Sequence, residues 1–246
     1  MQVEITVVPK EKIKITLNAW ESEDQYYSGM SKSVASILNM KARKFPYMES
    51  SEMSPEATSL LQTPVPIQGP LNIVYLDARS DAGLPHTRGM KGLALPVFLL
   101  WHPSEKTIQH EVVHLSQKQF SDRWWNWYKK HWNFRLASDK EFLSIPESWR
   151  SRRRINPDTL KQPYTIWKDR YIPLSVFSNE LNPDLRYCKR GFWDTKMSQW
   201  TWEAPSGWDK TFGSGFNDEH PNEISAHWID GSAGKEKKAY FDLNPI

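Results

Sequence analysis

The stretch KTIQHEVVHLSQKQ, at residues 106–119, is the most informative part of this sequence. Its apolar residues recur at spacings of four and three, which predicts an α-helix with one buried face. These residues are Ile108, Val112 and Leu115. His110 and His114 are four residues apart, so a helix places both imidazoles on one side. Two such histidines with Glu111 after the first are typical of a zinc site whose glutamate acts as a general base.

A catalytic zinc ion takes three protein ligands and keeps one position open, so the two histidines require a third ligand from elsewhere in the chain. We favour Glu223, in the predicted helical segment HPNEISAHWI at residues 220–229. The main alternative is Glu141, which lies 27 residues after His114 (141 − 114) but lacks a preceding Asn. His227, four residues after Glu223, faces the same side of its helix and is a further candidate ligand.

The HExxH motif and the downstream NExxA at 222–226 together resemble the metal-binding elements of gluzincins, the thermolysin-like branch of the zinc metallopeptidases. The resemblance implies that His110, His114 and Glu223 hold a zinc ion. It also implies peptide-bond hydrolysis by a metal-activated water, with Glu111 as general base. The implied fold is α+β and zincin-like, with a mixed sheet, an edge strand beside the HExxH helix, and a second helix that carries the glutamate ligand.

Two features depart from the gluzincin pattern. Glu223 follows His114 by 109 residues (223 − 114), whereas gluzincins usually supply this ligand soon after the HExxH helix. In addition, His227 stands where thermolysin-like enzymes carry an Asp that orients the first histidine. The departure implies either that another carboxylate orients His110 or that His227 has a different function.

We expect one zincin-like catalytic domain over residues 1–246, with strands and a helix in 1–70 and a long insertion at 135–215 between the two ligand-bearing helices. Alternating apolar residues predict strands, and apolar residues at helical spacing predict helices. Strands are expected at 2–8, 12–18, 71–77, 92–99 and 239–243, and on both sides of a hairpin turn at 168–169. Further helices are expected at 31–43 and 55–62.

Several residues are candidates for substrate binding and transition-state stabilisation. We expect 92–99 to be the edge strand that pairs with an extended peptide. His86 and Arg88 lie just before it and are candidate catalytic donors to the oxyanion of a tetrahedral intermediate, as is His220 beside the NExxA motif. The alternatives are a solvated turn at 83–89 and an exposed loop histidine at 220.

The chain holds 13 Trp, and several of them cluster in SDRWWNWYKKHWNF at 121–134. Together with the basic residues between them, these rings are compatible with a surface for single-stranded nucleic acid. Their spacing equally suits a helix that buries its rings in the core, which is the interpretation we favour. The net charge of only +3 does not indicate a nucleic-acid or membrane partner.

Cys188 is the only cysteine of the chain, so no internal disulfide forms and a reducing, intracellular setting is expected. The N-terminal sequence lacks the apolar core of a signal peptide, and no stretch has the length and hydrophobicity of a transmembrane helix. The resemblance to gluzincins implies that the partner is a peptide or protein substrate. The alternative is a catalytically inactive zincin-like scaffold that binds a protein or nucleic acid, which would have no need of Glu111.

Overall fold

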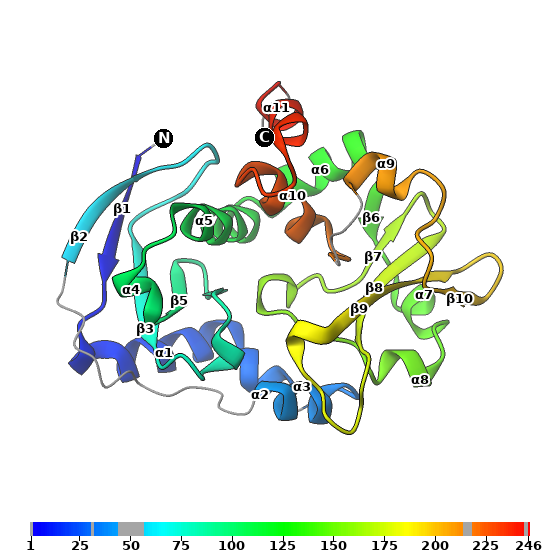
Figure 1. Cartoon of the computed structure of the whole chain (residues 1–246), viewed down its shortest axis with the longest axis horizontal. Coiled ribbons are helices and arrows are strands. Elements are labelled where there is room, and N and C mark those ends of the chain that lie inside the picture. The colour runs from blue at the N-terminus through cyan, green and yellow to red at the C-terminus, as the bar shows by residue number, and fades with distance from the viewer. Residues whose placement is uncertain (1, 31, 44–56, 214–217, 244–245) are drawn as a thin grey trace.

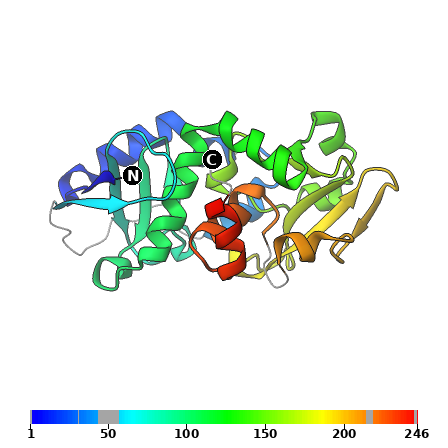
Figure 2. The same cartoon turned by 90° about the horizontal axis from the view of Figure 1, so that it is seen from above.

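The computed structural model describes residues 2–30, 32–43, 57–213, 218–243 and 246 of the chain. These residues form two five-stranded sheets, with the helices α5 (Glu105–Gln119) and α10 (Pro221–Ile229) between them (Figure 1). Figure 2 shows the same arrangement from above, with the first sheet on the left and the second on the right. The architecture is α+β, as the sequence predicted.

The first sheet is mixed, which agrees with the expectation from the sequence. Its strand order is β2-β1-β3-β5-β4, in which β1–β3 and β3–β5 are parallel and the two outer pairs are antiparallel. The strands are β1 (Gln2–Val7), β2 (Ala57–Gln62), β3 (Leu71–Leu76), β4 (His86–Arg88) and β5 (Gly92–Pro96). The central strand β3, LNIVYL, is almost entirely buried, because helices cover both of its faces.

Alternate side chains of β3 point to the helices on the two sides of the sheet. Val74 and Leu76 lie in one apolar cluster with α1 (Lys10–Asp24). Ile73 and Tyr75 lie in the larger core that includes the apolar face of α5. The apolar face that the sequence predicted for this helix therefore packs α5, which carries the HExxH motif, against the sheet.

Residues 12–18, predicted to form a strand, belong instead to α1. The alternation of Ile13, Ile15 and Leu17 suggested a period of two. The structure buries Ile13, Leu17 and Trp20, which recur at spacings of four and three, and leaves Ile15 72% exposed. The prediction was wrong because a short window fits both periods, and only the contact with the sheet selects the helical one.

Three other predicted elements differ from the structure. Over its described residues, the predicted helix at 55–62 is the strand β2, which pairs along its length with β1. The predicted closing strand at 239–243 lies inside the helix α11 (Lys235–Leu243). The predicted helix at 31–43 is confirmed only for α3 (Ser36–Arg43), and residue 31 lies outside the described residues.

The second sheet fills most of the interval between α5 and α10. It is an antiparallel meander in the order β10-β9-β8-β7-β6. Its strands are β6 (Phe134–Leu136), β7 (Thr165–Trp167), β8 (Tyr171–Phe177), β9 (Cys188–Asp194) and β10 (Gln199–Thr201). The predicted hairpin turn is confirmed, because Lys168 and Asp169 both have φ of 52°, the left-handed conformation that tight hairpins favour.

The tryptophan-rich segment forms the helix α6 (Ser121–Trp132) and contributes to the core, as we favoured. Trp124, Trp127 and Trp132 are buried, and the ring of Trp132 lies 4.7 Å from that of Trp228 in α10, centroid to centroid. Rings of the second sheet and of the helix Trp208–Phe212 that follows it join the same core. Because each ring buries a large apolar area, this core fixes α10 against the rest of the molecule.

The remaining helices are short and cover the outer parts of the two sheets. They are α2 (Tyr26–Met30), α4 (Phe98–Trp101), α7 (Asp139–Leu143), α8 (Glu147–Arg150) and α9 (Trp208–Phe212), with 3₁₀ turns at Asp81–Gly83, Pro157–Thr159 and Leu185–Tyr187. Among the residues that the structure describes, no helix is long and apolar enough to span a membrane.

The two isoleucines of α1 give a matched test of its helical packing. Ile13 is 2% exposed and Ile15 is 72% exposed. We expect Ile13→Ala to lower the free energy of unfolding by about 2–5 kcal/mol, because it leaves a cavity against the sheet. Ile15→Ala should change it by less than about 0.5 kcal/mol. Urea unfolding followed by circular dichroism measures both, and equal effects would contradict the helical assignment.

Candidate metal centre

Three side chains from the two central helices meet at one point. In α5, a side chain repeats its direction after four residues, so His110 and His114 project together, with their rings 4.8 Å apart. Glu223 lies in the first turn of α10. Its Oε2 lies 3.5 Å from Nε2 of His110 and 3.5 Å from Nε2 of His114. The structure therefore brings the three predicted ligands together across the 109-residue interval.

The distances from Oε2 of Glu223 to the two histidine nitrogens fit a metal ion. Zinc bonds of about 2.0–2.1 Å at tetrahedral angles separate neighbouring ligand atoms by about 3.3–3.4 Å. The observed 3.5 Å is close to this value. Nε2 of His114 is buried and has no hydrogen-bond partner among the described residues, which is costly for a polar atom unless another group binds it. Two imidazole nitrogens and one carboxylate oxygen form a donor set that suits zinc.

A carboxylate that the sequence did not identify orients His110. Nδ1 of His110 donates to Oδ2 of Asp230, at 2.9 Å. Asp230 is the C-cap of α10, seven residues after Glu223, so the carboxylate that orients His110 lies three residues beyond position 227. This hydrogen bond holds the proton on Nδ1 and leaves Nε2 as the metal-facing atom. Burial lowers the pKa of His110, but Asp230 and Glu223 outweigh it and raise this pKa well above its ordinary value.

His114 is oriented by an amide instead. Its Nδ1 donates to Oε1 of Gln117, at 2.8 Å. The amide direction is set by Nε2 of Gln117, which donates to the Asn222 carbonyl at 3.0 Å and to the Ser225 hydroxyl at 2.9 Å. Because a carbonyl only accepts, Oε1 must be the atom that faces His114. Gln117 thereby fixes the tautomer of His114 and also joins α5 to α10.

Glu223 is held at its other oxygen. The side-chain amide of Asn156 donates to its Oε1 and leaves Oε2 for the two histidines. Burial raises the pKa of Glu223, but His114 and His110 outweigh that effect and lower it well below its ordinary value. Glu223 is therefore a carboxylate, which is the form that a metal ligand requires.

Glu111 points into the same buried region. Its carboxylate lies close to those atoms of His114 and Asp158 that face a common centre, and its Oε2 has no hydrogen-bond partner among the described residues. Burial, followed by the charge of Asp158, raises the pKa of Glu111 to about 7. A carboxylate with a pKa near the working pH, and with one free oxygen, is suited to accept a proton.

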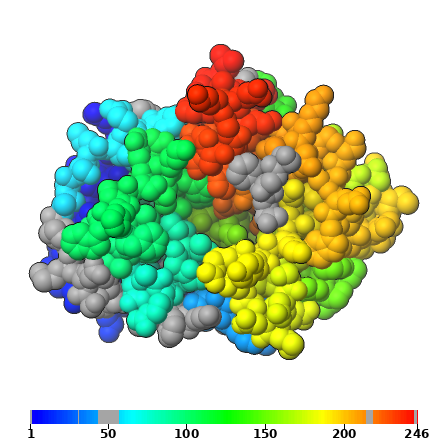
Figure 3. Space-filling view, in the orientation of Figure 1, coloured from blue at the N-terminus to red at the C-terminus, as the bar shows by residue number. Residues whose placement is uncertain are grey.

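These groups line a cleft of about 340 Å³, which we call the central cleft. Figure 3 shows the surface hollowed near its centre, between α5 in green and the segment before β9 in yellow. The predicted His86 is part of its wall, with Nδ1 3.0 Å from the Leu84 carbonyl. His227 also lines the cleft, and its Nε2 lies 3.2 Å from Oδ2 of Asp218. Its ring lies 4.6 Å from that of His110.

The predicted substrate-pairing strand 92–99 is not at the edge of the sheet. β5 covers only Gly92–Pro96 of it and lies between β3 and β4. The edge strand is β4, and both outward peptide groups of its central residue Thr87 are already used. Its N–H donates to Asp158 at 3.0 Å, and its carbonyl accepts from Lys118 at 3.1 Å. The prediction of 92–99 as the edge strand was wrong because the actual edge strand, β4, has only 3 residues, too few for a recognisable alternation in the sequence.

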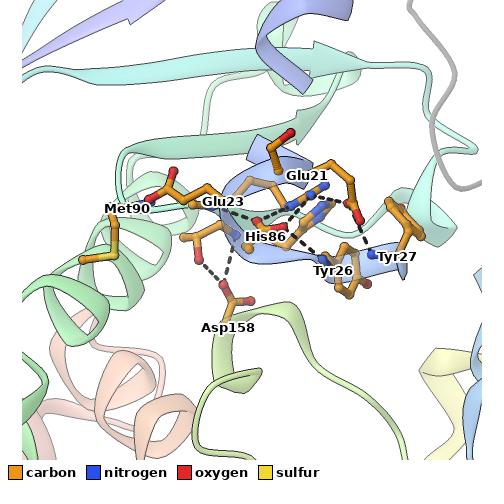
Figure 4. Close-up of polar contacts among 12 residues, drawn as sticks. Glu21, Glu23, Tyr26, Tyr27, His86, Met90 and Asp158 are labelled. Atoms are coloured by element: carbon orange, nitrogen blue, oxygen red, sulfur yellow. Dashed lines mark hydrogen bonds and ion pairs between the residues drawn. The ribbon is translucent and has the colours of Figure 1, made fainter. Parts of the chain in front are cut away.

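Arg88, predicted as an oxyanion donor, does not line the cleft. It is fully buried and forms ion pairs with Asp24 at 2.6 Å and Glu21 at 2.8 Å. Figure 4 shows this region, with Glu21 and Tyr27 on one side and Asp158 approaching from the other. Arg88 therefore joins the C-terminal end of α1 to β4, and its function is structural.

Two other predicted site residues also lie outside the cleft. His220 is buried as the N-cap of α10, where Nδ1 accepts from the N–H of Asn222 at 3.1 Å and Nε2 lies 2.9 Å from the Gln162 carbonyl. Burial lowers the pKa of His220 to about 4, so it is neutral at pH 7. Glu141 forms a capping box with Ser138 and pairs with Arg135 at 2.7 Å, so it is not available as a third ligand.

The sequence reasoning missed four supporting residues. They are Gln117, Asn156, Asp158 and Asp230. Gln117 lies three residues after His114, and this spacing was a signal that could have been used. Asn156 and Asp158 belong to the segment NPD at 156–158, and nothing in the sequence relates this segment to the HExxH helix.

Comparisons of the chain with protein-family models, with curated proteins and with solved structures found no match. The support for the candidate centre is therefore its own geometry.

The metal-free protein should lose stability as the pH rises. Burial lowers the pKa of His114, but Glu223 and Asp158 outweigh it and raise this pKa to about 9, so its stabilising charge is lost between about pH 6.5 and 9. The raised pKa of Glu111 acts in the same direction up to about pH 7. We expect a loss on the order of 2 kcal/mol between pH 6.5 and 9, measured by urea unfolding in the presence of a chelator. Stability that is constant or that rises over this range would contradict the proposed charge states.

Proposed function

We propose that this chain is a zinc-dependent metallopeptidase of the gluzincin type, in which His110, His114 and Glu223 hold the ion and Glu111 is the general base. The observation that carries the proposal is the position of Oε2 of Glu223, 3.5 Å from Nε2 of His110 and 3.5 Å from Nε2 of His114, on the helix that also carries Glu111. A chance HExxH would not require a carboxylate from a distant helix to lie between its two histidines.

The surrounding architecture supports a zincin-like assignment. α5 lies on one face of a mixed sheet, and α10 packs against α5 and presents its glutamate to the histidines. The second sheet then represents a long insertion between the two ligand-bearing helices. Both histidines have hydrogen-bonded partners at Nδ1, an arrangement that is usual for metal ligands.

The residues of the chain have distinct tasks in this proposal. When bound, zinc acts as a Lewis acid that activates water and polarises the peptide carbonyl. Glu111 accepts the proton of the attacking water and passes it to the leaving amine. His227, held by Asp218, and His86 line the cleft and are the candidate donors to the oxyanion. Asn156 keeps Glu223 in place during the reaction.

The alternative of a non-catalytic scaffold receives less support. The rings of α6 that suggested a nucleic-acid surface are largely buried in the core. A binding scaffold also has no use for a buried carboxylate such as Glu111, whose Oε2 has no partner among the described residues. Burial of such a group costs free energy, which is more readily explained by a catalytic task.

Zinc content tests the ligand set. We expect purified protein to bind one zinc ion, measured by elemental analysis and competition with a chromophoric chelator. Asp230→Ala should weaken zinc binding by about 10–100-fold, because it removes only a supporting hydrogen bond. Glu223→Ala should weaken it further, since a ligand is lost. Glu141→Ala is the matched control and should bind zinc like the wild type. Unchanged zinc affinity in Glu223→Ala would exclude Glu223 as a ligand.

Peptide hydrolysis tests the general base. Glu111→Gln keeps the size of the side chain but removes its basicity, so we expect zinc content to be retained and kcat to fall by about 10²–10⁴-fold. The assay is digestion of a peptide library followed by mass spectrometry. Glu105→Gln, at the exposed start of α5, is the matched control and should keep full activity. Full activity in Glu111→Gln would refute the assigned function of this residue.

A further inference from the structure

Among the described residues, the guanidinium of one arginine in the central cleft, Arg154, has no hydrogen-bond or ion-pair partner. Arg43 in the wall of the cleft pairs with Asp81 at 2.8 Å, and Arg186 pairs with Asp184. The backbone of Arg154 is nevertheless fixed, because its N–H donates to the Ser175 carbonyl of β8 at 2.7 Å.

Arg154 lies where two cavities meet. It lines the central cleft together with Asn156, and both residues also line a second cavity of about 330 Å³. The guanidinium is partly buried and is attracted from a longer range by carboxylates that include Glu219 and the metal-site residue Glu223. A partly buried guanidinium whose N–H donors are not used by any described residue is suited to bind an anionic group of a ligand.

A carboxylate is the group that matches a guanidinium best, because two parallel N–H donors meet two oxygens. The cleft is less suited to an ammonium group. Of the other carboxylates in its wall, Asp81 pairs with Arg43, Asp158 accepts from Thr87, and Asp218 lies beside His227. The carboxylate of the cleft whose oxygen has no partner among the described residues, Glu111, is the proposed general base and is not available to hold a peptide N-terminus. The guanidinium of Arg154, by contrast, is not bonded by any described residue.

The shape of the site indicates the end of a peptide rather than its middle. An internal stretch of substrate usually binds along a free strand edge, but the outward peptide groups of Thr87 on β4 are occupied. The central cleft has a volume of about 340 Å³, which is sufficient for a short chain end. A short chain end with a charged anchor fits these constraints.

We propose that Arg154 binds the C-terminal carboxylate of the substrate, so that the enzyme removes residues from the C-terminus of peptides. This inference rests on the proposed peptidase function and adds the substrate class. Arg154 then positions the last peptide bonds of the chain at the metal centre.

The test compares three peptides of one sequence: a free C-terminal acid, the C-terminal amide, and an amide that ends in Glu. The zinc-loaded wild type should prefer the free acid over the amide by about 30-fold or more in kcat/KM. Arg154→Gln should abolish this preference, and Arg154→Lys should retain part of it, because lysine lacks the two-pronged geometry. Arg152→Gln is the matched control, since Arg152 pairs with Glu180 and lines neither cavity, and it should keep the preference.

Calorimetric binding provides a readout that does not depend on turnover. Zinc-loaded Glu111→Gln should bind the free acid about 30-fold more tightly than the amide, and addition of Arg154→Gln should remove the difference. If the wild type cleaves neither peptide, the peptidase proposal fails, and this binding comparison still decides the assignment of Arg154. If the free acid and the amide are cleaved and bound equally well, the C-terminal assignment is wrong. It is also wrong if the amide that ends in Glu is cleaved and bound as well as the free acid. A loss of zinc affinity in Arg154→Gln with the preference unchanged would show that Arg154 only balances nearby carboxylates, and would also overturn it.

Discussion

The hydrogen bonds of Gln117 are the constraint on which the candidate centre depends. Through one oxygen this side chain orients His114, and through its nitrogen it binds the Asn222 carbonyl and the Ser225 hydroxyl of α10. The Tyr128 hydroxyl lies 2.8 Å from Ser225 and extends the network to α6. The side chains of this network are buried, so a shift of α10 along α5 would leave several polar groups without partners. The register that places Glu223 between the two histidines is thus fixed by the same side chain that orients one of them.

The second sheet supports this arrangement from the other side. Its rings and those of α6 form one continuous core, in which Trp132 packs on Trp228 of α10. The loop between α8 and β7 supplies Asn156 to Glu223 and Asp158 to the edge of β4. The long interval between the ligand-bearing helices therefore builds one wall of the cleft and holds the third ligand.

Buried charge gives the site its chemical character. Glu111, Asp158 and Glu223 gather around two histidines, and removal of so many charges from water is costly without compensation. In the metal-free protein the histidines compensate by retaining protons, which is why the pKa of His114 rises. A bound dication would replace those protons and favour the ionised form of Glu111. The partial burial of the Arg154 guanidinium reduces its contact with water and thereby strengthens its attraction for a carboxylate.

The HExxH helix, its buried stripe, the mixed sheet and the helix of Glu223 were predictable from sequence, because each depends on a local period or motif. The helix α1 was not, since Ile13, Ile15 and Leu17 fit two periods until the sheet buries one face. The choice of Glu223 over Glu141 rested on motif context, and only the fold shows that Glu141 is already paired with Arg135. Asp230, Asn156 and Arg154 could not be assigned to the centre from the sequence. Their proximity to the centre results from contacts between segments far apart in the chain, which residue spacing does not encode.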